Sequence, residues 1–319
     1  MGIFSKALVS KPASTVTWPL FPRKVQFDWQ QKSPFHWIPN DPFASHAINN
    51  FGFMLVRGEY FFCRIFNKAL PHIHDEKLLT DVKIFIRQEA IHAQAHKEAI
   101  EQYLQNYGVD TAANYAKAAQ LFDKILADKP LGFTLPKVLH KEWLLLRVCM
   151  VAAAEHFTAG IGHYVLCNSH WEARGADPVV SDLFTWHSAE EVEHRTVAHD
   201  LYMHLGGNYP RRILIMAAVV PILIYLMAEG TAKLAQVDPD MPKDQRNIRS
   251  SGFWKAWFNA DKEHRLPGPL WLVTKSLSYF KPNYDPFYEA STELALNYIN
   301  QSPGVLAAQR SVKATEVKA

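Results

Sequence analysis

Two copies of the pattern Glu-x-x-His carry the clearest chemical signal in the sequence. They are EAIH, from Glu89 to His92, and EVEH, from Glu191 to His194. On a helix, residues three positions apart share a face, so each pair can offer a carboxylate and an imidazole to one metal ion. The pattern alone is weak, because a chain of this composition contains about one such pair by chance.

Two further glutamates interrupt apolar stretches. Glu59 lies in GEYFF, and Glu155 lies in VCMVAAAEHFTAG. A carboxylate in such a run is costly to bury unless it is paired or coordinates a metal. We therefore predict that both residues share a site with the two Glu-x-x-His pairs.

The spacing of the four glutamates fits two helical hairpins. Residues equidistant from the turn of an antiparallel helix pair lie at the same height, because both helices rise about 1.5 Å per residue. The midpoint of Glu59 and Glu89 is position 74, inside the expected turn PHIHDE. The midpoint of Glu155 and Glu191 is position 173, inside the expected turn SHWEARGADP. Two such hairpins packed together would gather four carboxylates and two imidazoles in the core of a bundle.

This donor set indicates a dinuclear metal site that is also the catalytic site, formed by Glu59, Glu89, His92, Glu155, Glu191 and His194. Carboxylates and imidazoles without thiolates suit iron, manganese or, less often, zinc. Four negative charges can neutralise two divalent ions. We predict two iron ions, with manganese or zinc as alternatives. The competing interpretation, a set of salt-bridged surface residues, is disfavoured by the two matching midpoints.

Several polar and aromatic residues near the motifs have less certain roles. His96 and His187 each lie one helical turn from a predicted ligand. Either could be an extra ligand or could orient a ligand. The favoured interpretation for each is a histidine that is merely hydrogen-bonded or solvated. Helical geometry points Glu190 and Glu193 away from the site, so we expect solvated acids there. His156 points elsewhere for the same reason. Two aspartates could orient the ligand histidines or lie on the surface, Asp81 and Asp200. Six aromatic residues could wall a pocket or pack in the core: Tyr60, Phe61, Phe62, Phe157, Tyr164 and Trp186.

Four long helices must position the site. Apolar periodicity and stop signals predict them, with a shorter connecting helix, over 45–70, 75–107, 114–127, 137–167 and 179–205. Gly108 ends the second helix, and Gly206 and Gly207 end the last. Strand signals are nearly absent. The predicted fold class is therefore all-α, with two helical hairpins joined by a long crossover into a four-helix bundle.

The bundle is predicted to occupy residues 46–207, between two different flanks. Residues 1–45 hold six of the nineteen prolines without helical periodicity, which indicates an extended arm. Residues 208–319 are expected to form a helical extension packed on the bundle. Its aromatic-rich helices span about 252–300, and a small, polar, mobile tail follows Pro303.

One segment raises the question of a membrane. Ile213 to Ala228 contains only apolar residues and one proline, but a spanning helix needs roughly 20 such residues. Burial against the bundle is the favoured interpretation. Peripheral contact with a membrane is the main alternative, and a full span is less favoured.

Composition excludes other classes of protein. A content of 48% hydrophobic and 20% charged residues is typical of an ordered globular protein. The net charge of +3, without a basic run interleaved with aromatics, argues against a nucleic-acid partner. The three cysteines lack Cys-x-x-Cys spacing and no secretory signal is visible, so we expect the protein in the reducing cytoplasm. If the apolar segment contacts lipid, we expect it at the inner face of the membrane. A homodimer is one of the oligomeric states compatible with the sequence.

Four stretches resemble a bacterial family of predicted metal-dependent hydrolases: GEYFF, IRQEAIHAQAH, AAAEHFTAG and WHSAEEVEHRTVAHD. The resemblance covers about positions 40 to 290 and departs at none of the six ligand positions. The family is similar in ligand order to ferritin-like di-iron carboxylate proteins. The resemblance implies a ferritin-like bundle in which Glu89 and Glu191 bridge the ions while Glu59 and Glu155 are terminal ligands.

Two reactions fit this site. The favoured one is an O₂-dependent oxidation, in which two ferrous ions activate O₂ against a small, mostly apolar organic substrate. The alternative is the hydrolysis that the family label implies, with a metal-bridging hydroxide attacking an ester or amide. No serine-triad signature supports a metal-free hydrolase. An iron store is a third hypothesis, which the arm and the C-terminal extension argue against.

Overall fold

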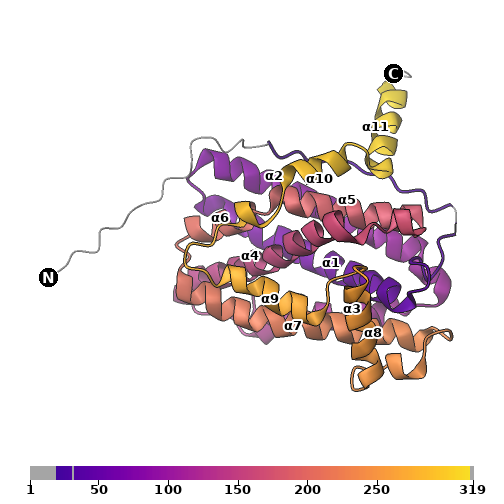
Figure 1. The fold of residues 1–319 in the computed structure, drawn as a ribbon. Coiled ribbons are helices and arrows are strands. Elements are labelled where there is room, and N and C mark those ends of the chain that lie inside the picture. Colours follow the sequence, from indigo (N-terminus) through magenta and orange to yellow (C-terminus); the bar gives the residue numbers. More distant parts are fainter. Residues whose placement is uncertain (1–18, 31, 317–319) are drawn as a thin grey trace.

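The protein is all-helical over the residues that the computed structural model describes, 19–30 and 32–316, with side-chain surroundings described as far as residue 312. No strand occurs in this part of the chain, which confirms the predicted all-α class. The long helices lie side by side and the shorter C-terminal helices cover them (Figure 1). The first eighteen residues of the predicted arm lie outside the described part, and residues 19–41 form no long helix.

The first predicted hairpin consists of α1 (Pro42–Ala69) and α2 (Glu76–Gln102). Each helix begins at an aspartate whose carboxylate accepts from a backbone N–H of the first turn, Asp41 from Ala44 and Asp75 from Leu78. The α2 helix is shorter than predicted, because a 3₁₀ turn replaces its last stretch. The chain still turns at Gly108, whose φ of 70° suits glycine.

The second hairpin consists of α4 (His140–Tyr164) and α5 (Pro178–His194), and α4 packs mainly against α5. The crossover between the hairpins contains α3 (Thr111–Ala119) and a π-helical turn, Gln120–Ile125. α4 and α5 approach closely at Gly162, where a Cβ atom would lie 2.3 Å from the Ser188 carbonyl oxygen. A side chain at this position would clash with that oxygen, so glycine allows the two helices to pack closely beside the site.

The fourth predicted helix is wrong in one respect, because it is two helices. α5 ends at His194, and α6 (Val197–His204) begins after a two-residue break. The guanidinium of Arg195 donates to the carbonyl oxygens of Val192, Pro286 and Phe287. A side chain that binds a carbonyl of its own helix competes with the helical ladder, which accounts for the break.

The C-terminal part contains five helices: α7 (Tyr209–Val237), α8 (Ser251–Lys262), α9 (Pro269–Tyr279), α10 (Thr292–Ile299) and α11 (Pro303–Glu316). α7 packs on α1 and α4, and α10 packs on α5. The tail after Pro303 forms a helix as far as Glu316, and its mobility stays a prediction. Its first turn is held to the body by Gly304, whose N–H donates to Asp182. The division into arm, bundle and extension stays a prediction.

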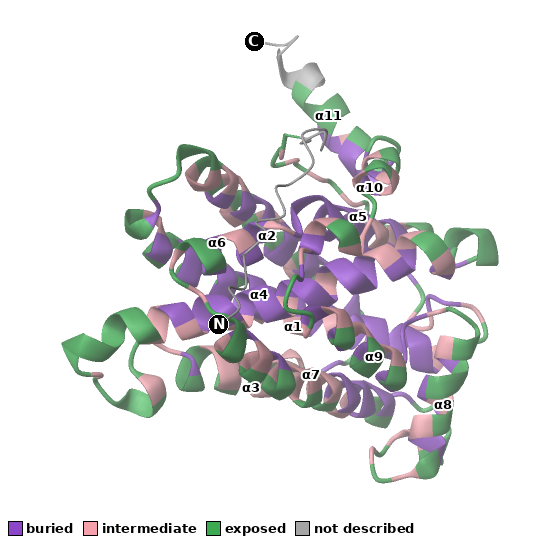
Figure 2. Ribbon diagram, turned by 60° about the vertical axis from the view of Figure 1, so that its left-hand side comes forward, coloured by how far each residue is buried: buried purple, intermediate pink, exposed green. Residues whose placement is uncertain are grey.

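Two segments are long and apolar enough to cross a membrane, by length and composition alone: residues 137–169 and α7. The first is a core element, 72% buried in its most apolar window, whereas the corresponding window of α7 is 22% buried. Figure 2 shows this contrast between α4 and α7. Burial of α7 against the bundle is therefore confirmed for one side only, and Leu214 and Tyr225 are exposed on the other.

Candidate metal centre

The six predicted ligands converge in the interior of the bundle. They are Glu59 from α1, Glu89 and His92 from α2, Glu155 from α4, and Glu191 and His194 from α5. All six residues are at most 3% exposed, which excludes the alternative of salt-bridged surface residues. The structure thus brings together the residues that the two midpoints selected; their role as ligands stays a prediction.

Their donor atoms form two groups that could each hold a metal ion. One group is Glu59, His92, His187 and Glu191, and the other is Glu89, Glu155, Glu191 and His194. Within each group the donor atoms lie within 4.8 Å of one another. Glu191 belongs to both groups, because its Oε1 lies 2.8 Å from His187 Nε2 while its Oε2 lies 3.5 Å from His194 Nε2. Two oxygens that face different groups are what a bridging carboxylate needs.

The structure also places His187 where a ligand would lie. Its Nε2 is 2.8 Å from Glu191 and 3.4 Å from Glu59, so it is placed among donor atoms that could hold an ion, and the extra-ligand alternative stays a prediction. Glu89 reaches both predicted imidazoles, with Oε1 at 3.2 Å from His194 Nε2 and 3.9 Å from His92 Nδ1. The bridging role predicted for Glu89 is compatible with these distances.

Buried polar atoms without hydrogen-bonding partners test whether metal ions fit. Among the described residues, both carboxylate oxygens of Glu59, Glu89 and Glu155 lack such a partner, as does Glu191 Oε2. The unpartnered imidazole nitrogens are His92 Nδ1 and His194 Nε2. An unsatisfied buried group costs about 1–3 kcal/mol, and more when it is charged, unless it coordinates a metal. This set of oxygens and nitrogens therefore fits metal ions of the kind that carboxylates and imidazoles prefer.

Burial and mutual contact set the charges of the metal-free centre. Burial raises the pKa of Glu59 and Glu89 and raises that of Glu155 to about 7. Burial alone would lower the pKa of His92 and His194. The neighbouring glutamates outweigh this effect and raise the two values to about 9 and about 10. In the metal-free protein, protons on these glutamates and histidines therefore reduce the negative charge that metal ions would otherwise balance.

We predict that the metal-free protein loses stability as the pH rises. The folded pKa of Glu155 exceeds its ordinary value of 4.5, so its contribution falls between pH 4.5 and about 7. His92 and His194 contribute below their ordinary value of 6.5 and lose this contribution as the pH passes about 9 and about 10. Burial lowers the pKa of His187 to about 4. This residue therefore adds stability as the pH rises from about 4 to 6.5, and its contribution no longer changes above pH 6.5. Each proton corresponds to about 1.4 kcal/mol per pH unit.

Thermal unfolding followed by circular dichroism at pH 6.5 and pH 9, with and without added metal, checks this prediction. Bound ions replace the protons, so the unfolding midpoint of the loaded protein should change much less across this range. The same fall in midpoint for both forms would contradict it.

Each imidazole in the two groups has its other ring nitrogen engaged. The pairs are His92 Nε2 with Glu190 at 3.0 Å, His194 Nδ1 with Gln88 at 3.3 Å, and His187 Nδ1 with His96 at 2.5 Å. Such contacts fix the orientation and tautomer of a ligating histidine. His96 is placed to orient His187 through this contact, and its role at a metal site stays a prediction.

Arg23 from the N-terminal segment completes this surrounding network. Its guanidinium donates to both oxygens of Glu193, each at 2.7 Å, and to Glu190 at 3.2 Å. Glu193 also accepts from the side-chain amide of Gln88 at 2.9 Å. One arginine therefore pairs with two buried carboxylates, of which Glu190 contacts His92 directly and Glu193 contacts His194 through Gln88.

The prediction that Glu190 and Glu193 are solvated acids is wrong. They are 0% and 6% exposed, because α5 is buried on nearly its whole circumference, with α10 and the segment around Arg23 on its outer faces. Sequence reasoning also missed Gln88 and Arg23. Gln88 directly precedes Glu89 and could have been considered. Arg23 lies in a proline-rich segment without periodicity and gives no signal.

Of the remaining candidates, His156 and Asp81 lie away from the two groups, whereas Trp186 packs against one of their residues. His156 is buried and contacts the Tyr284 hydroxyl and the Lys275 carbonyl oxygen, so it points elsewhere as predicted. Asp81 pairs with Lys77 on the outside of α2 rather than with a ligand histidine. Trp186 is fully buried, and its ring lies edge-on to the His92 ring with centroids 5.0 Å apart.

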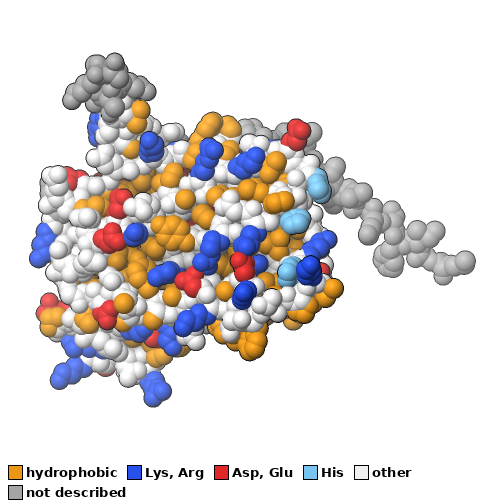
Figure 3. Space-filling view, turned by 180° about the vertical axis from the view of Figure 1, so that it is seen from behind, with side chains coloured by type: hydrophobic (Ala, Val, Ile, Leu, Met, Phe, Trp, Pro, Cys, Tyr) orange, Lys and Arg blue, Asp and Glu red, His pale blue; other side chains and the backbone are white. Residues whose placement is uncertain are grey.

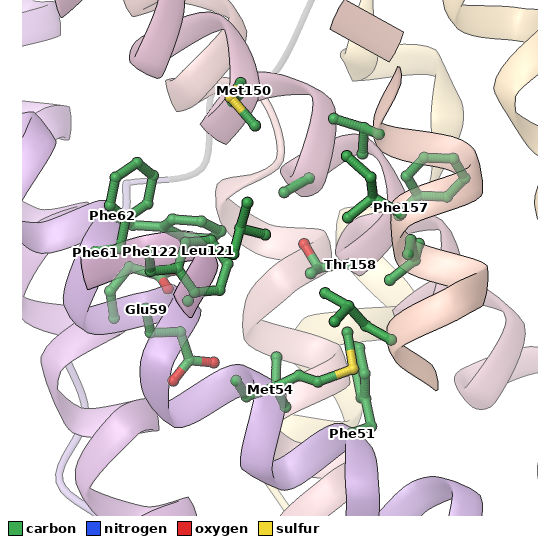
Figure 4. Close-up of a pocket in the computed structure, with 18 of the residues that line it drawn as sticks. Phe51, Met54, Glu59, Phe61, Phe62, Leu121, Phe122, Met150, Phe157 and Thr158 are labelled. Atoms are coloured by element: carbon green, nitrogen blue, oxygen red, sulfur yellow. The ribbon is translucent and has the colours of Figure 1, made fainter. Parts of the chain in front are cut away.

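An apolar cavity opens directly onto the centre (Figure 4). Its empty volume is about 860 Å³, including open solvent at its mouth. Three predicted aromatic residues line it, Phe61, Phe62 and Phe157, as do three carboxylates of the centre, Glu59, Glu89 and Glu191. Figure 4 shows the Glu59 side chain among apolar neighbours. By contrast, Tyr60 is 39% exposed, and Tyr164 contacts Asp261 outside this cavity.

Fold and site together define an all-helical protein with buried carboxylate and histidine groups that could bind metal, next to an apolar cavity. A family model described as predicted metal-dependent hydrolase matches residues 21–289, and the chain belongs to this family. The match confirms the resemblance found in the sequence motifs. No curated protein and no solved structure matches the chain.

Proposed function

We propose that the protein is a metal-dependent hydrolase that cleaves an ester or amide of a mostly apolar substrate. The main support is the pair of donor groups that share Glu191 beside an apolar cavity, in a chain of this family. Two divalent ions held by these groups would supply a hydroxide nucleophile at neutral pH and stabilise negative charge on the substrate oxygen.

Glu59 is the residue best placed to handle protons. Its carboxylate belongs to one donor group and also lines the cavity. It can accept a proton from the attacking water and return it to the leaving group. The apolar walls around it would exclude bulk water and hold the substrate.

Reconstitution under strict exclusion of O₂ tests the hydrolase. Metal-free protein loaded separately with zinc, manganese and ferrous ions would be assayed against 4-nitrophenyl esters and anilides of linear acids. We expect turnover without O₂ that depends on the ion and disappears on chelation. Absence of anaerobic turnover with all three ions would overturn the proposal.

An O₂-dependent oxidation is the second candidate, and the cavity favours it. Thr158 is the only uncharged polar residue among the lining residues of the first cavity, so few groups there could hydrogen-bond an ester or amide. Two iron ions would supply the oxidising chemistry, and the chain would place an apolar substrate and exclude water. Consumption of O₂ by the ferrous protein, absent from the zinc-loaded protein, would support this reaction.

Iron is the native ion we propose for the oxidation, and manganese or zinc is the ion we propose for hydrolysis. The cytoplasmic location and the homodimer stay predictions.

A further inference from the structure

A second cavity lies on the other side of Glu191 from the first. Its empty volume is about 540 Å³, including open solvent, and it shares five lining residues with the first cavity: Phe51, Leu55, Thr158, Ile161 and Glu191. Along α1 the combined lining runs from Ala47 to Phe62. At 1.5 Å per residue this distance is about 22 Å. The space available to a substrate is therefore long and narrow.

The candidate metal centre lies beside the middle of this passage. Glu59 and Glu89 line the first cavity, His187 lines the second, and Glu191 lines both. Away from these residues the lining is almost entirely aliphatic and aromatic. A polar substituent against these walls would be buried without a partner, at a cost in free energy.

We infer that the substrate carries a long, unbranched hydrocarbon chain whose reacting group lies next to Glu191, partway along the passage. The position of the reacting group rests on the proposed function, whereas the recognition of the chain does not. A linear chain fits the length of the passage, and burial of each methylene group favours binding.

Binding of neutral linear alcohols, from butanol to decanol, to the metal-free protein tests the chain recognition by calorimetry. Affinity should rise about four-fold per methylene group, the factor that its transfer out of water implies, until the passage is filled. Ala47→Leu should fill the far end of the second cavity, so the rise should stop at a shorter chain while short alcohols bind unchanged. Phe51→Ala should widen the wall shared by the two cavities and strengthen binding of the longest alcohols.

Ala90→Leu, on an exposed position of α2, is the matched control and should bind like the natural protein. Affinities that do not depend on chain length, or that Ala47→Leu and Phe51→Ala both leave unchanged, would overturn the inference. Chain-length-dependent binding without any anaerobic turnover would contradict the hydrolase alone, which keeps the two failures distinguishable.

A second inference concerns the surface next to this cavity. Residues 129–139, before α4, expose four large apolar side chains, Leu131, Phe133, Val138 and Leu139, at 66%, 72%, 82% and 45%. Exposed lysines alternate with them at Lys124, Lys129, Lys137 and Lys141. We call these eight residues the basic-apolar surface. Figure 3 shows apolar side chains beside Lys and Arg side chains along the lower edge of the molecule.

The charge of this surface is not cancelled locally. The acids of the same segment have other partners: Asp123 pairs with Arg57 and Arg64, Asp128 with Lys68 and Arg147, and Glu142 with Arg211. None of the four lysines forms an ion pair with the described residues. Side chains of Leu121, Phe122 and Leu126, just before this segment, line the first cavity together with residues of α7. The basic-apolar surface thus adjoins a wall of the cavity.

We propose that the basic-apolar surface docks onto an anionic lipid bilayer, with the exposed side of α7 beside it. Apolar side chains interleaved with lysines suit the boundary between acyl chains and negatively charged headgroups. A second copy of the chain fits less well, because a two-fold contact through this surface would bring lysines against lysines. Docking here would place the cavity close to a source of hydrocarbon chains.

Sedimentation with vesicles tests the docking, comparing phosphatidylcholine alone with an equal mixture of phosphatidylcholine and phosphatidylglycerol. We expect binding to the mixture that weakens at high salt. Lys129→Glu with Lys137→Glu should weaken it by at least about 25-fold, about five-fold for each lysine charge lost. Phe133→Ser with Val138→Ser should weaken it on both kinds of vesicle.

Lys255→Glu, an exposed lysine of α8, is the matched control and should leave binding unchanged. Equal sedimentation of the natural protein and the Lys129→Glu, Lys137→Glu variant would overturn the proposal. A second result would also overturn it: the natural protein does not bind vesicles but is a dimer by light scattering, and the Phe133→Ser, Val138→Ser variant is a monomer.

Discussion

A Glu191→Gln variant is expected to lose more than 100-fold in activity and to bind fewer than two metal ions. Glu191 is the one residue in both donor groups, and its two oxygens face different imidazoles, His187 and His194. Glutamine keeps the shape but lacks the negative charge and presents one oxygen instead of two. Loss of an orienting partner alone costs about 10–100-fold, so loss of a shared ligand should exceed that range.

Metal analysis by mass spectrometry and the thermal midpoint with and without added ions would measure this effect. The rise in midpoint that ions give the natural protein should be largely absent from the variant. Glu172→Gln, an exposed position, serves as the control with the same chemical change. Full metal content in Glu191→Gln would show that the two groups are not a shared centre.

An Arg23→Met variant should lower the free energy of unfolding by about 3–5 kcal/mol, the usual effect of leaving buried charges unpaired. The side chain of Arg23 is 17% exposed, while those of its partners Glu190 and Glu193 are fully buried. Removing the guanidinium leaves two carboxylates next to each other without a cation. Because Glu190 also orients His92, metal affinity should fall by about 10–100-fold in the same variant.

A double variant distinguishes this mechanism from a general loss of packing. Adding Glu193→Gln to Arg23→Met removes one of the stranded charges, so it should restore part of the lost stability. Chemical denaturation gives the free energies, and Arg249→Met, an exposed arginine, is the control. If the double variant were less stable than Arg23→Met, unpaired charge would not be the cause.

Periodicity and composition were sufficient to predict the main helices and the convergence of the six residues. The reason is geometric: both hairpins obey the fixed rise of the helix, so equal distances from a turn imply equal heights. Glu59 and Glu155 stood out because each interrupts an apolar run, and the structure buries both. The apolar cavity was less accessible to prediction, since residues of α1, α4 and α7 line it together.

The errors share a physical origin in long-range contacts. Glu190 and Glu193 looked solvated because periodicity cannot tell a solvent-facing side from one covered by Arg23 and α10. Arg195, at the break after His194, also binds carbonyl oxygens more than ninety positions away, at Pro286 and Phe287. No local pattern encodes such partners, and a proline-rich segment such as that around Arg23 has no periodicity to read.

The contact between Arg23 and α5 also constrains the order of events during synthesis. Arg23 is added to the growing chain 167 residues before Glu190. Until then the arginine has no acidic partner there, and the donor groups lack Glu191 and His194 altogether. The centre therefore cannot assemble co-translationally from its first hairpin. Ion uptake and the closing of the N-terminal segment over α5 must both wait until α5 has been made.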